Sequence, residues 1–345
     1  MAPLSMAQHS ETFRSIPPRP RVIVTRRLLP SVEARMAELF DVVLNPEDTP
    51  MTRAQLEAAM RDCDVLVPTV TDTIDAAMIA AAAKANGRLG MIASFGAGTE
   101  HIDVAAARAH RIMVTNTPGV FTDDTADLTL ALIILVSRRF SENAQTLREG
   151  KWAGWGPSVM LGHALGGKTL GIVGMGRIGQ AVAHRARAFG MEIRYHNRHR
   201  LPGAVENMFA ARNVPDLDTL VAEADILTLH CPAGPETIHL MDARRIALMK
   251  PAACLVNTGR GQLIDEEALI AALSQERIAG AGLDVFAREP QVDPRLFDLP
   301  GLVALPHLGS ATYEGRGAAG ERLIANIRFW VDGHRPHDMV LPQLP

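Results

Sequence analysis

Three glycines in the middle of the chain have the spacing of a dinucleotide-binding loop. In the string LGIVGMGRIG, Gly174, Gly176 and Gly179 form a G-x-G-x-x-G pattern after an aliphatic run and before a helical stretch. Such glycines allow a tight turn, let a pyrophosphate approach the backbone, and let the helix pack closely on the strand. The start of that helix would face the phosphates with its amide groups. The pattern therefore predicts a site for a dinucleotide.

The end of the next predicted strand indicates which dinucleotide fits best. NAD sites usually carry an acidic residue there, which accepts hydrogen bonds from the ribose hydroxyls. Here the chain instead has the string Asn197-Arg198-His199-Arg200. Arginine pairs with a phosphate that a carboxylate would repel, so the string favours the 2′-phosphate of NADP(H), with NAD(H) as the alternative. A solvated basic turn would have the same composition.

The first third of the chain alternates short aliphatic runs with alanine-rich helical stretches, which is typical of a parallel sheet covered by helices. The predicted strands are Val22–Thr25, Val42–Leu44, Val65–Pro68, Leu89–Ala93 and Ile112–Thr115. The predicted helices are Ser31–Phe40, Arg53–Arg61, Asp75–Lys84 and Val104–Ala109. Together they predict a small doubly wound domain that ends near Pro118.

A long helix and a second series of strands are expected next. The helix runs from Thr122, in a string suited to N-capping, to Gly150, and its apolar middle should be buried between domains or subunits. The predicted strands are Thr169–Val173, Glu192–His196, Asp225–Leu229, Ala253–Asn257, Ala281–Val285 and Val303–Leu305. The other predicted helices are Arg177–Phe189 and Arg316–Val331, and the second of these could fold back onto the first domain. Ligands bind at the carboxyl ends of such strands, so the loops there should form the site.

Composition argues against several classes of protein. The chain has 345 residues, 47% hydrophobic and 21% charged, with a formal net charge of −3, so it offers no broad basic surface for nucleic acid. Its apolar runs, such as Leu130–Val136, are far shorter than the ~18 residues of a membrane span. Cys63, Cys231 and Cys254 lack the spacing of a disulfide framework or a metal site, so we expect no metal and a reducing compartment such as the cytoplasm. Residues 1–20 do not resemble a secretory signal and are expected to be a loose leader.

Three further motifs give the chain a family resemblance. They are NTGRG at 257–261, GLDVF at 282–286 followed by Glu289-Pro290, and PHLGS at 306–310. With the glycine loop, and in this order, they resemble the D-isomer-specific 2-hydroxyacid dehydrogenases, and among these the glyoxylate/hydroxypyruvate reductases. The resemblance extends from about residue 21 to residue 336. It implies an α/β fold of two doubly wound parallel-sheet domains, in which a Rossmann cofactor domain is inserted into a flavodoxin-like substrate domain.

The same resemblance implies how the chain is divided and assembled. Residues 21–118 with 308–345 would form the substrate-binding domain, and residues 119–307 would form the NAD(P)-binding domain. The family also implies a homodimer built around the cofactor domain and the long helix that begins near Thr125. Small 2-oxo and 2-hydroxy acids would be the other binding partners.

The three catalytic residues of the family correspond to Arg260, Glu289 and His307. An arginine could hold the carboxylate and the C2 oxygen of a 2-oxo acid and polarise the carbonyl. An imidazole could donate a proton to that oxygen as hydride arrives at C2. A glutamate could hydrogen-bond the far ring nitrogen, fix the tautomer and favour the charged imidazole. The implied reaction is the NAD(P)H-dependent reduction of small 2-oxo acids to D-2-hydroxy acids.

The residues expected to contact the two ligands follow from the same motifs. For the cofactor they are Gly174, Met175, Gly176, Arg177, Ile178, Gly179, Asn197, Arg198, His199, Arg200, Cys231, Pro232, Thr258, Gly259, Asp284, Gly309 and Thr125. For the substrate they are Val70, Ala97, Gly98, Arg260 and Trp155. Backbone amides in the loop 94–98 would bind the carboxylate. Trp152 and Trp155 could simply pack the dimer, or Trp155 could reach the active site of the partner subunit.

Other members of the same fold stay open as alternatives. A formate dehydrogenase would have glutamine in place of Glu289, so Glu289 argues against that activity. A 3-phosphoglycerate dehydrogenase often carries a further C-terminal domain. A dinucleotide-sensing corepressor of this fold would bind the cofactor with negligible turnover. The preferred 2-oxo acid is also open among glyoxylate, hydroxypyruvate and phenylpyruvate.

Overall fold

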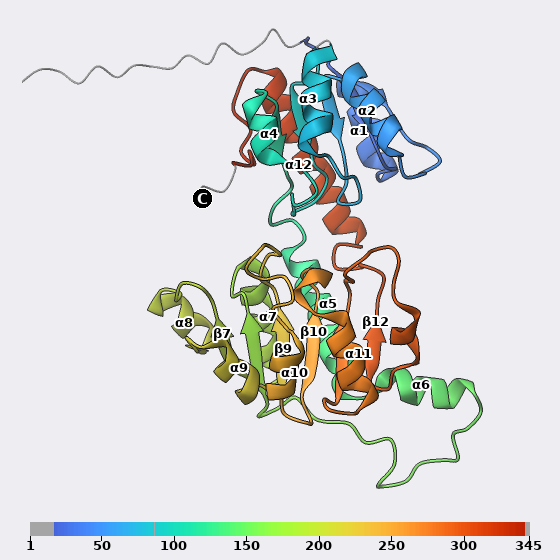
Figure 1. The fold of residues 1–345 in the computed structure, drawn as a ribbon, viewed down its shortest axis with the longest axis vertical. Helices are drawn as coiled ribbons and strands as arrows, with labels where there is room; N and C mark the ends of the chain where they lie inside the picture. Colours follow the sequence, from blue (N-terminus) through green and yellow to red (C-terminus); the bar gives the residue numbers. More distant parts are fainter. Residues whose placement is uncertain (1–16, 86, 342–345) are drawn as a thin grey trace, which may run out of the picture. The chain divides into compact units, whose positions relative to one another are not determined.

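The computed structural model describes residues 17–85 and 87–341, which form two compact units. Unit 1 contains the chain up to Val120 together with the residues from Tyr313 onward, and unit 2 is Phe121–Thr312. The chain thus leaves unit 1, builds unit 2 and returns to unit 1 (Figure 1). Most of the expected leader, residues 1–16, lies outside the described residues.

Unit 1 is a parallel five-stranded sheet in the order β2-β1-β3-β4-β5, with helices between the strands. The strands are β1 (Arg21–Val24), β2 (Asp41–Val43), β3 (Val65–Val67), β4 (Met91–Ala93) and β5 (Met113–Thr115). The helices are α1 (Pro30–Leu39), α2 (Arg53–Asp62), α3 (Ala76–Ala85), α4 (Val104–Ala109) and α12 (Tyr313–Val331). The strands and helices predicted here are confirmed, and α12 returns to pack on α1. The two helices approach so closely that a Cβ on Gly320 would lie 2.3 Å from Val32 Cγ2.

Unit 2 is a parallel seven-stranded sheet in the order β12-β11-β10-β9-β6-β7-β8. The strands are β6 (Thr169–Val173), β7 (Glu192–His196), β8 (Ala211–Asn213), β9 (Ile226–Leu229), β10 (Cys254–Asn257), β11 (Gly280–Leu283) and β12 (Leu302–Ala304). The helices are α5 (Thr122–Ser137), α6 (Phe140–Arg148), α7 (Arg177–Ala188), α8 (Gly203–Phe209), α9 (Leu217–Glu223), α10 (Ala243–Leu248) and α11 (Glu266–Ser274). The pattern in the sequence did not predict β8 or the helices α8 to α11.

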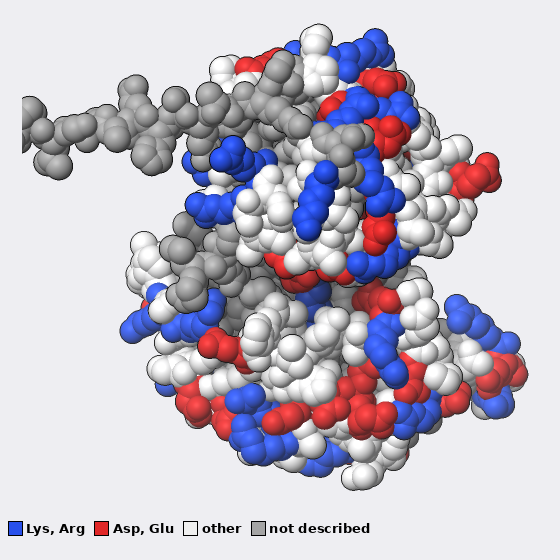
Figure 2. All heavy atoms as spheres, turned by 45° about the horizontal axis from the view of Figure 1, so that its top comes forward, with Lys and Arg blue, Asp and Glu red and all other residues white. Residues whose placement is uncertain are grey.

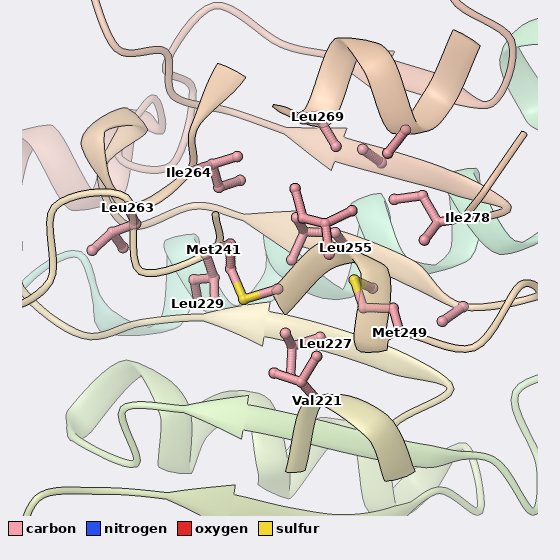
Figure 3. Close-up of a cluster of buried hydrophobic side chains, with 14 of the residues drawn as sticks. Val221, Leu227, Leu229, Met241, Met249, Leu255, Leu263, Ile264, Leu269 and Ile278 are labelled. Carbon is pink, nitrogen blue, oxygen red and sulfur yellow. The ribbon is translucent and has the colours of Figure 1, made fainter. Parts of the chain in front are cut away.

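The core of unit 2 lies on both faces of its sheet because successive strand residues point to opposite faces. Leu227, Leu229 and Leu255 pack with α9, α10 and α11 on one face, and Figure 3 shows this cluster. Leu170 and Ile172 pack with α5 and α7 on the other face. Fully burying an aliphatic side chain of this size stabilises the fold by roughly 1.5–3 kcal/mol. The two layers hold the strand ends, and hence the loops of the site, in fixed positions.

The single long helix predicted over Thr122–Gly150 is wrong, because the chain forms two helices there. The helix α5 ends at Ser137, and Arg139 adopts a left-handed conformation with φ of 53° before α6 begins. The amide of His163 donates to the Ser137 carbonyl at 2.8 Å, so that oxygen is no longer available to a continuing helix. A contact from a distant segment therefore interrupts a helical pattern that is locally unbroken.

The apolar middle of α5 is buried within unit 2. It packs against α7 and against β10 and β11, where two glycines allow close contact. A Cβ on Gly280 would lie 2.7 Å from Val136 Cγ2, and one on Gly282 would lie 3.2 Å from Leu132 Cβ. Burial within unit 2 thus accounts for one side of α5, while Leu128, Ala131, Ile134 and Leu135 are only partly buried there. The expected burial of this helix between domains or subunits stays a prediction.

Charges are intermingled on the face of the molecule that Figure 2 shows, where lysines and arginines alternate with aspartates and glutamates. Within residues 17–85 and 87–341, no helix combines the length and the apolar character that crossing a membrane requires.

Candidate active site

The glycine loop joins β6 to α7, and its geometry explains each glycine. Gly174 has φ of 97°, and a Cβ there would lie 2.5 Å from the amide nitrogen of Cys231. A Cβ on Gly179 would lie 2.3 Å from the carbonyl oxygen of Gly174. A Cβ on Gly176, at the start of α7, would point into open space. The loop thus combines a tight turn, a close helix contact and open backbone, and it fits the pyrophosphate of a dinucleotide.

The turn after β7 is hydrogen-bonded to the glycine loop. Asn197 Oδ1 accepts from the amide of Met175 at 2.7 Å, so the side chain predicted to face the ribose also shapes the phosphate loop. The side chain of Arg198 is 80% exposed, and its guanidinium lies 3.8 Å from the carboxylate of Glu236. His199 is exposed as well. The turn therefore presents Arg198 at the surface.

Arg200 has a different environment from Arg198. Its Nε and Nη2 donate to the two carboxylate oxygens of Glu206 at 2.9 and 2.7 Å. The hydroxyl of Tyr195 donates to Glu206 Oε1 at 2.7 Å and accepts from the amide of Leu201 at 2.9 Å. These bonds, first from Arg200 and then from Tyr195, lower the pKa of Glu206 to about 2. Sequence reasoning did not identify Glu206 or Tyr195, since no local pattern marks either residue.

Arg260, Glu289 and His307 follow the ends of three adjacent strands, β10, β11 and β12. Glu289 Oε2 lies 2.7 Å from His307 Nδ1, and Glu289 Oε1 accepts from the amide of Phe286 at 2.8 Å. With Nδ1 held by the carboxylate, Nε2 is the ring nitrogen that can exchange a proton with a substrate. Two of the three predicted catalytic side chains are therefore in direct contact.

The partners of Glu289 hold the pKa of its carboxyl below the ordinary value. Burial by itself would raise the pKa of this carboxyl, but the hydrogen bonds from His307 and from the Phe286 amide outweigh that effect. The charge of Arg260 acts in the same direction, and the pKa of Glu289 lies below its ordinary value. A carboxylate in this position favours a positive charge on the imidazole that it contacts.

The loop that carries Arg260 is shaped by its neighbours. Asn257 Nδ2 donates to the carbonyl of Arg260 at 2.8 Å, and Asn257 Oδ1 accepts from the amide of Gly259 at 3.0 Å. Arg260 Nη1 donates to the carbonyl of Gly259 at 2.8 Å. A Cβ on Gly261 would lie 1.9 Å from the carbonyl carbon of Phe286, so only glycine lets this loop approach the one that holds Glu289.

The backbone after His307 is held by a buried carboxylate. Asp284 accepts from the amides of Leu308 and Gly309 at 2.6 and 2.8 Å, and the amide of His307 donates to the carbonyl of Asp284 at 2.9 Å. Burial raises the pKa of Asp284, and the two amide bonds offset only part of that rise. His307 itself has φ of 56°, a left-handed conformation that costs energy in a residue with a side chain. The bonds to Asp284 hold that conformation.

Two threonines expected at the cofactor site support the same region. Thr125 Oγ1 donates to the carbonyl of Gly309 at 2.9 Å. Thr129 Oγ1 lies 2.8 Å from Thr258 Oγ1, so α5 is tied to the loop after β10. Cys231 and Pro232 follow β9, and Cys231 packs beside Gly174. Burial raises the pKa of the Cys231 thiol to about 11, which keeps this thiol neutral.

The residues predicted to bind substrate are divided between the units. Val70, Ala97 and Gly98 belong to unit 1, where a Cβ on Gly96 would lie 3.1 Å from Val70 Cγ1, so their two loops are neighbours. The side chain of Asn116 donates to the carbonyl of Ala97 at 2.6 Å. Trp155 belongs to unit 2 and is 84% exposed, in the segment after α6 that extends away from the sheet in Figure 1.

No metal site accompanies these residues in the part of the chain that the structure describes, since no three His, Cys, Asp or Glu side chains are grouped to hold an ion.

Comparison with known proteins identifies the family. Residues 130–309, more than half of the chain, match the family described as D-isomer specific 2-hydroxyacid dehydrogenase, NAD binding domain. The chain is 42% identical over 326 residues to a glyoxylate reductase of Thermococcus litoralis, covering 93% of this chain and 97% of that protein. It is 41% identical over 324 residues to a glyoxylate reductase of Korarchaeum cryptofilum, with coverages of 93% and 96%.

Solved structures agree in fold over nearly the whole chain. A putative D-isomer specific 2-hydroxyacid dehydrogenase from Polaromonas is 40% identical, with a TM-score of 0.87 and coverages of 94% of this chain and 100% of that one. An NADPH-dependent glyoxylate/hydroxypyruvate reductase from Sinorhizobium meliloti, in complex with NADP and malonate, is 33% identical, with a TM-score of 0.82 and coverages of 93% and 97%. The predicted α/β fold of two parallel-sheet domains and the predicted oxidoreductase class are confirmed. The chain belongs to the D-isomer-specific 2-hydroxyacid dehydrogenase family.

Proposed function

We propose that this protein reduces small 2-oxo acids, such as glyoxylate or hydroxypyruvate, to D-2-hydroxy acids, with NADPH preferred over NADH. The observation that carries the proposal is the 2.7 Å contact between Glu289 Oε2 and His307 Nδ1, which follow β11 and β12, in the same sheet as β10, the strand before Arg260. The names of the similar glyoxylate reductases support the substrate class. Residues 119–307 would bind the cofactor, and residues 21–118 with 308–345 would bind the substrate.

Each side chain has a distinct task in the proposed reaction. Arg260 binds the substrate carboxylate and the C2 oxygen through its planar set of donors and polarises the carbonyl. His307 gives the proton on Nε2 to the C2 oxygen, while Glu289 stabilises the charged imidazole through Nδ1. When bound, the reduced dinucleotide supplies the hydride that C2 receives. In the oxidation of a 2-hydroxy acid, His307 Nε2 takes the proton from the C2 hydroxyl instead.

The remaining predicted contacts complete the proposed site. The amides of Ala97 and Gly98 would bind the substrate carboxylate, and Val70 would line the side-chain pocket. The pyrophosphate would lie on the glycine loop, over Gly176, where a Cβ would meet nothing within 4 Å.

A panel of 2-oxo acids tests the proposal. The kcat/KM values for glyoxylate, hydroxypyruvate and phenylpyruvate are measured with NADPH and with NADH. At least one combination of acid and cofactor should be turned over at an ordinary enzymatic rate. A preference for phenylpyruvate would narrow the substrate class without changing the chemistry. Tight cofactor binding with negligible reduction of every acid would favour the dinucleotide-sensing alternative and contradict the proposal.

Cofactor preference is expected to favour NADPH by tenfold or more in kcat/KM, about 1.4 kcal/mol. The turn after β7 lacks a carboxylate at its first position and exposes Arg198, which can pair with the 2′-phosphate. The double variant Asn197→Asp with Arg198→Ala should invert the preference, because aspartate accepts the ribose hydroxyls of NADH and repels the phosphate. It also keeps an oxygen for the Met175 amide. Steady-state kinetics with both cofactors measure the ratio.

The control for this prediction is Arg212→Ala, which removes an exposed arginine of β8 on the same unit and should leave the ratio unchanged. Raised salt should weaken the binding of NADPH more than that of NADH, because salt screens the exposed charge pair between Arg198 and the 2′-phosphate. A parent enzyme that uses NADH better at low salt would show that the basic turn is only solvated surface.

We also propose that the protein is a homodimer built around unit 2. The support is a concentration of exposed apolar side chains in α6 and the segment after it, namely Phe140, Leu147, Trp152, Trp155, Val159, Met160 and Leu161. Exposed apolar surface of this kind is typical of an interaction site. Sedimentation velocity should give twice the 37.2 kDa of one chain, and Trp155→Arg should shift the population toward monomer. A parent protein that sediments as a monomer at micromolar concentration would rule the dimer out.

A further inference from the structure

The turn after β7 is closed by a ring of hydrogen bonds that no local sequence pattern indicates. Tyr195, on β7, is fully buried, and only 9% of the side chain of Glu206, on α8, is exposed. Tyr195 accepts from the Leu201 amide and donates to Glu206, and Glu206 accepts two bonds from Arg200. The ring therefore runs from the strand to the helix and back through the turn, which lies between β7 and α8 in Figure 1.

The turn that this ring closes is also hydrogen-bonded to the glycine loop. Asn197, at the start of the turn, accepts from the Met175 amide at 2.7 Å, and the amide of Gly174 donates to the carbonyl of His196 at 3.0 Å. A shift of the turn would move both of these bonds. The position of the turn therefore matters for any dinucleotide bound on the glycine loop, whether or not it carries a 2′-phosphate.

The two arginines of the turn differ in how their charge is used. Arg200 is paired through two donors with the carboxylate of a buried glutamate, so its positive charge is largely compensated. Arg198 lies beyond hydrogen-bond distance of Glu236, at 3.8 Å, and both of these side chains are about four-fifths exposed. An exposed pair at that distance compensates little charge. Arg198 is thus the arginine whose charge is available to a ligand.

We propose that Tyr195, Glu206 and Arg200 form a latch that fixes the turn after β7 for cofactor binding, while Arg198 alone contacts the 2′-phosphate. Glu206 and Arg200 are then positioning residues that influence NADPH and NADH alike. The part that concerns Arg198 rests on the proposed preference for NADPH. The part that concerns the latch does not, because it predicts an effect common to both cofactors.

Dissociation constants test the latch in the full-length protein. They are measured by calorimetry for NADPH and NADH, and for adenosine 2′,5′-bisphosphate and 5′-AMP, which probe the adenosine end alone. Arg198→Ala should raise the dissociation constants of the two 2′-phosphorylated ligands, NADPH and adenosine 2′,5′-bisphosphate, by tenfold or more. It should change those of NADH and 5′-AMP by less than twofold. Glu206→Gln and Arg200→Ala should each weaken all four ligands at least threefold, with the ratio of NADPH to NADH affinity changed less than threefold.

Two further variants keep the result interpretable. Tyr195→Phe removes one hydroxyl at nearly constant volume, so it should fold and should weaken both cofactors as the other latch variants do. Arg212→Ala, on neighbouring β8, removes a charge outside the latch and should leave all four constants within twofold of the parent.

Three outcomes would overturn the latch. Arg200→Ala could weaken only the 2′-phosphorylated ligands, which would make Arg200 a direct ligand. Glu206→Gln could tighten NADPH alone, which would mean that Glu206 competes with the phosphate for Arg200. Glu206→Gln and Tyr195→Phe could leave NADH binding unchanged, which would show that the ring has no bearing on the cofactor. If instead the proposed preference for NADPH is wrong, the ratio of NADPH to NADH affinity would be the same in Arg198→Ala as in the parent.

Discussion

His307→Ala is expected to lower kcat by about 10² to 10⁴, the usual contribution of a positioned proton donor. The imidazole is held on Nδ1 by Glu289 at 2.7 Å, so its loss removes the proton source at the C2 oxygen without touching the glycine loop. Affinity for the cofactor should therefore stay nearly unchanged. Steady-state kinetics and cofactor titration measure the two quantities, and His184→Ala, at an exposed position on α7, is the matched control.

Glu289→Gln tests, with the same kinetic measurements, whether Glu289 acts on proton donation by His307 or only packs against it. The parent carboxylate is ionised at neutral pH, and its partners hold its pKa below the ordinary value. A carboxylate in contact with an imidazole favours its charged form, which is the proton donor in the proposed reduction. A neutral glutamine removes this stabilisation, and the alkaline limb of the kcat/KM profile should move to lower pH. Superimposable profiles would mean that the pair has no part in the proton transfer, as would unaltered turnover in His307→Ala.

Arg260→Lys is expected to lower kcat/KM by about 10- to 150-fold although it keeps the positive charge. A guanidinium meets two oxygens at once with a planar pair of donors, which a single ammonium cannot reproduce. Losing one charge-assisted hydrogen bond of ~1.5–3 kcal/mol in the transition state gives a reduction of that size. The change should appear in both kcat and KM for the 2-oxo acid, because Arg260 is proposed to bind the carboxylate as well as to polarise the carbonyl.

The matched control for Arg260→Lys is Arg288→Lys, an exposed arginine in the loop after β11. Cofactor affinity, measured separately, should change little in either variant. If Arg260→Lys stays within twofold of the parent in kcat/KM, Arg260 supplies only general positive charge and the proposed double contact is incorrect.

Local signals were sufficient for most of the secondary structure and for the glycine loop. Aliphatic runs predicted the strands before Gly174, Arg260 and His307, because β-branched and aliphatic residues fill a sheet buried on both faces. The spacing of the three glycines predicted the turn that the structure shows, with φ of 97° at Gly174. The short helices α8 to α11 were not predicted, because each spans only six to nine residues and has little periodic pattern.

Contacts between distant segments decided the features that were missed. The break between α5 and α6 depends on His163, which takes the Ser137 carbonyl from 26 residues away along the chain (163 − 137). No glycine or proline marks that break in the string Ser137-Arg138-Arg139-Phe140. The partner of Arg200 likewise depends on α8, which had not been predicted and which supplies Glu206.

By itself, the sequence determined the strand-and-helix alternation, the position of each motif at a strand end, and through those motifs the family. These properties depend on residues within a few positions of one another, so they can be read along the chain. The resemblance to the family implied the contact between Glu289 and His307, which the structure places at 2.7 Å. Only the tertiary structure decided that Asp284 holds the loop after His307, and that Arg200 is paired while Arg198 is exposed. Those outcomes depend on strand order and on the packing of segments far apart in the sequence, which place particular polar atoms within hydrogen-bond distance.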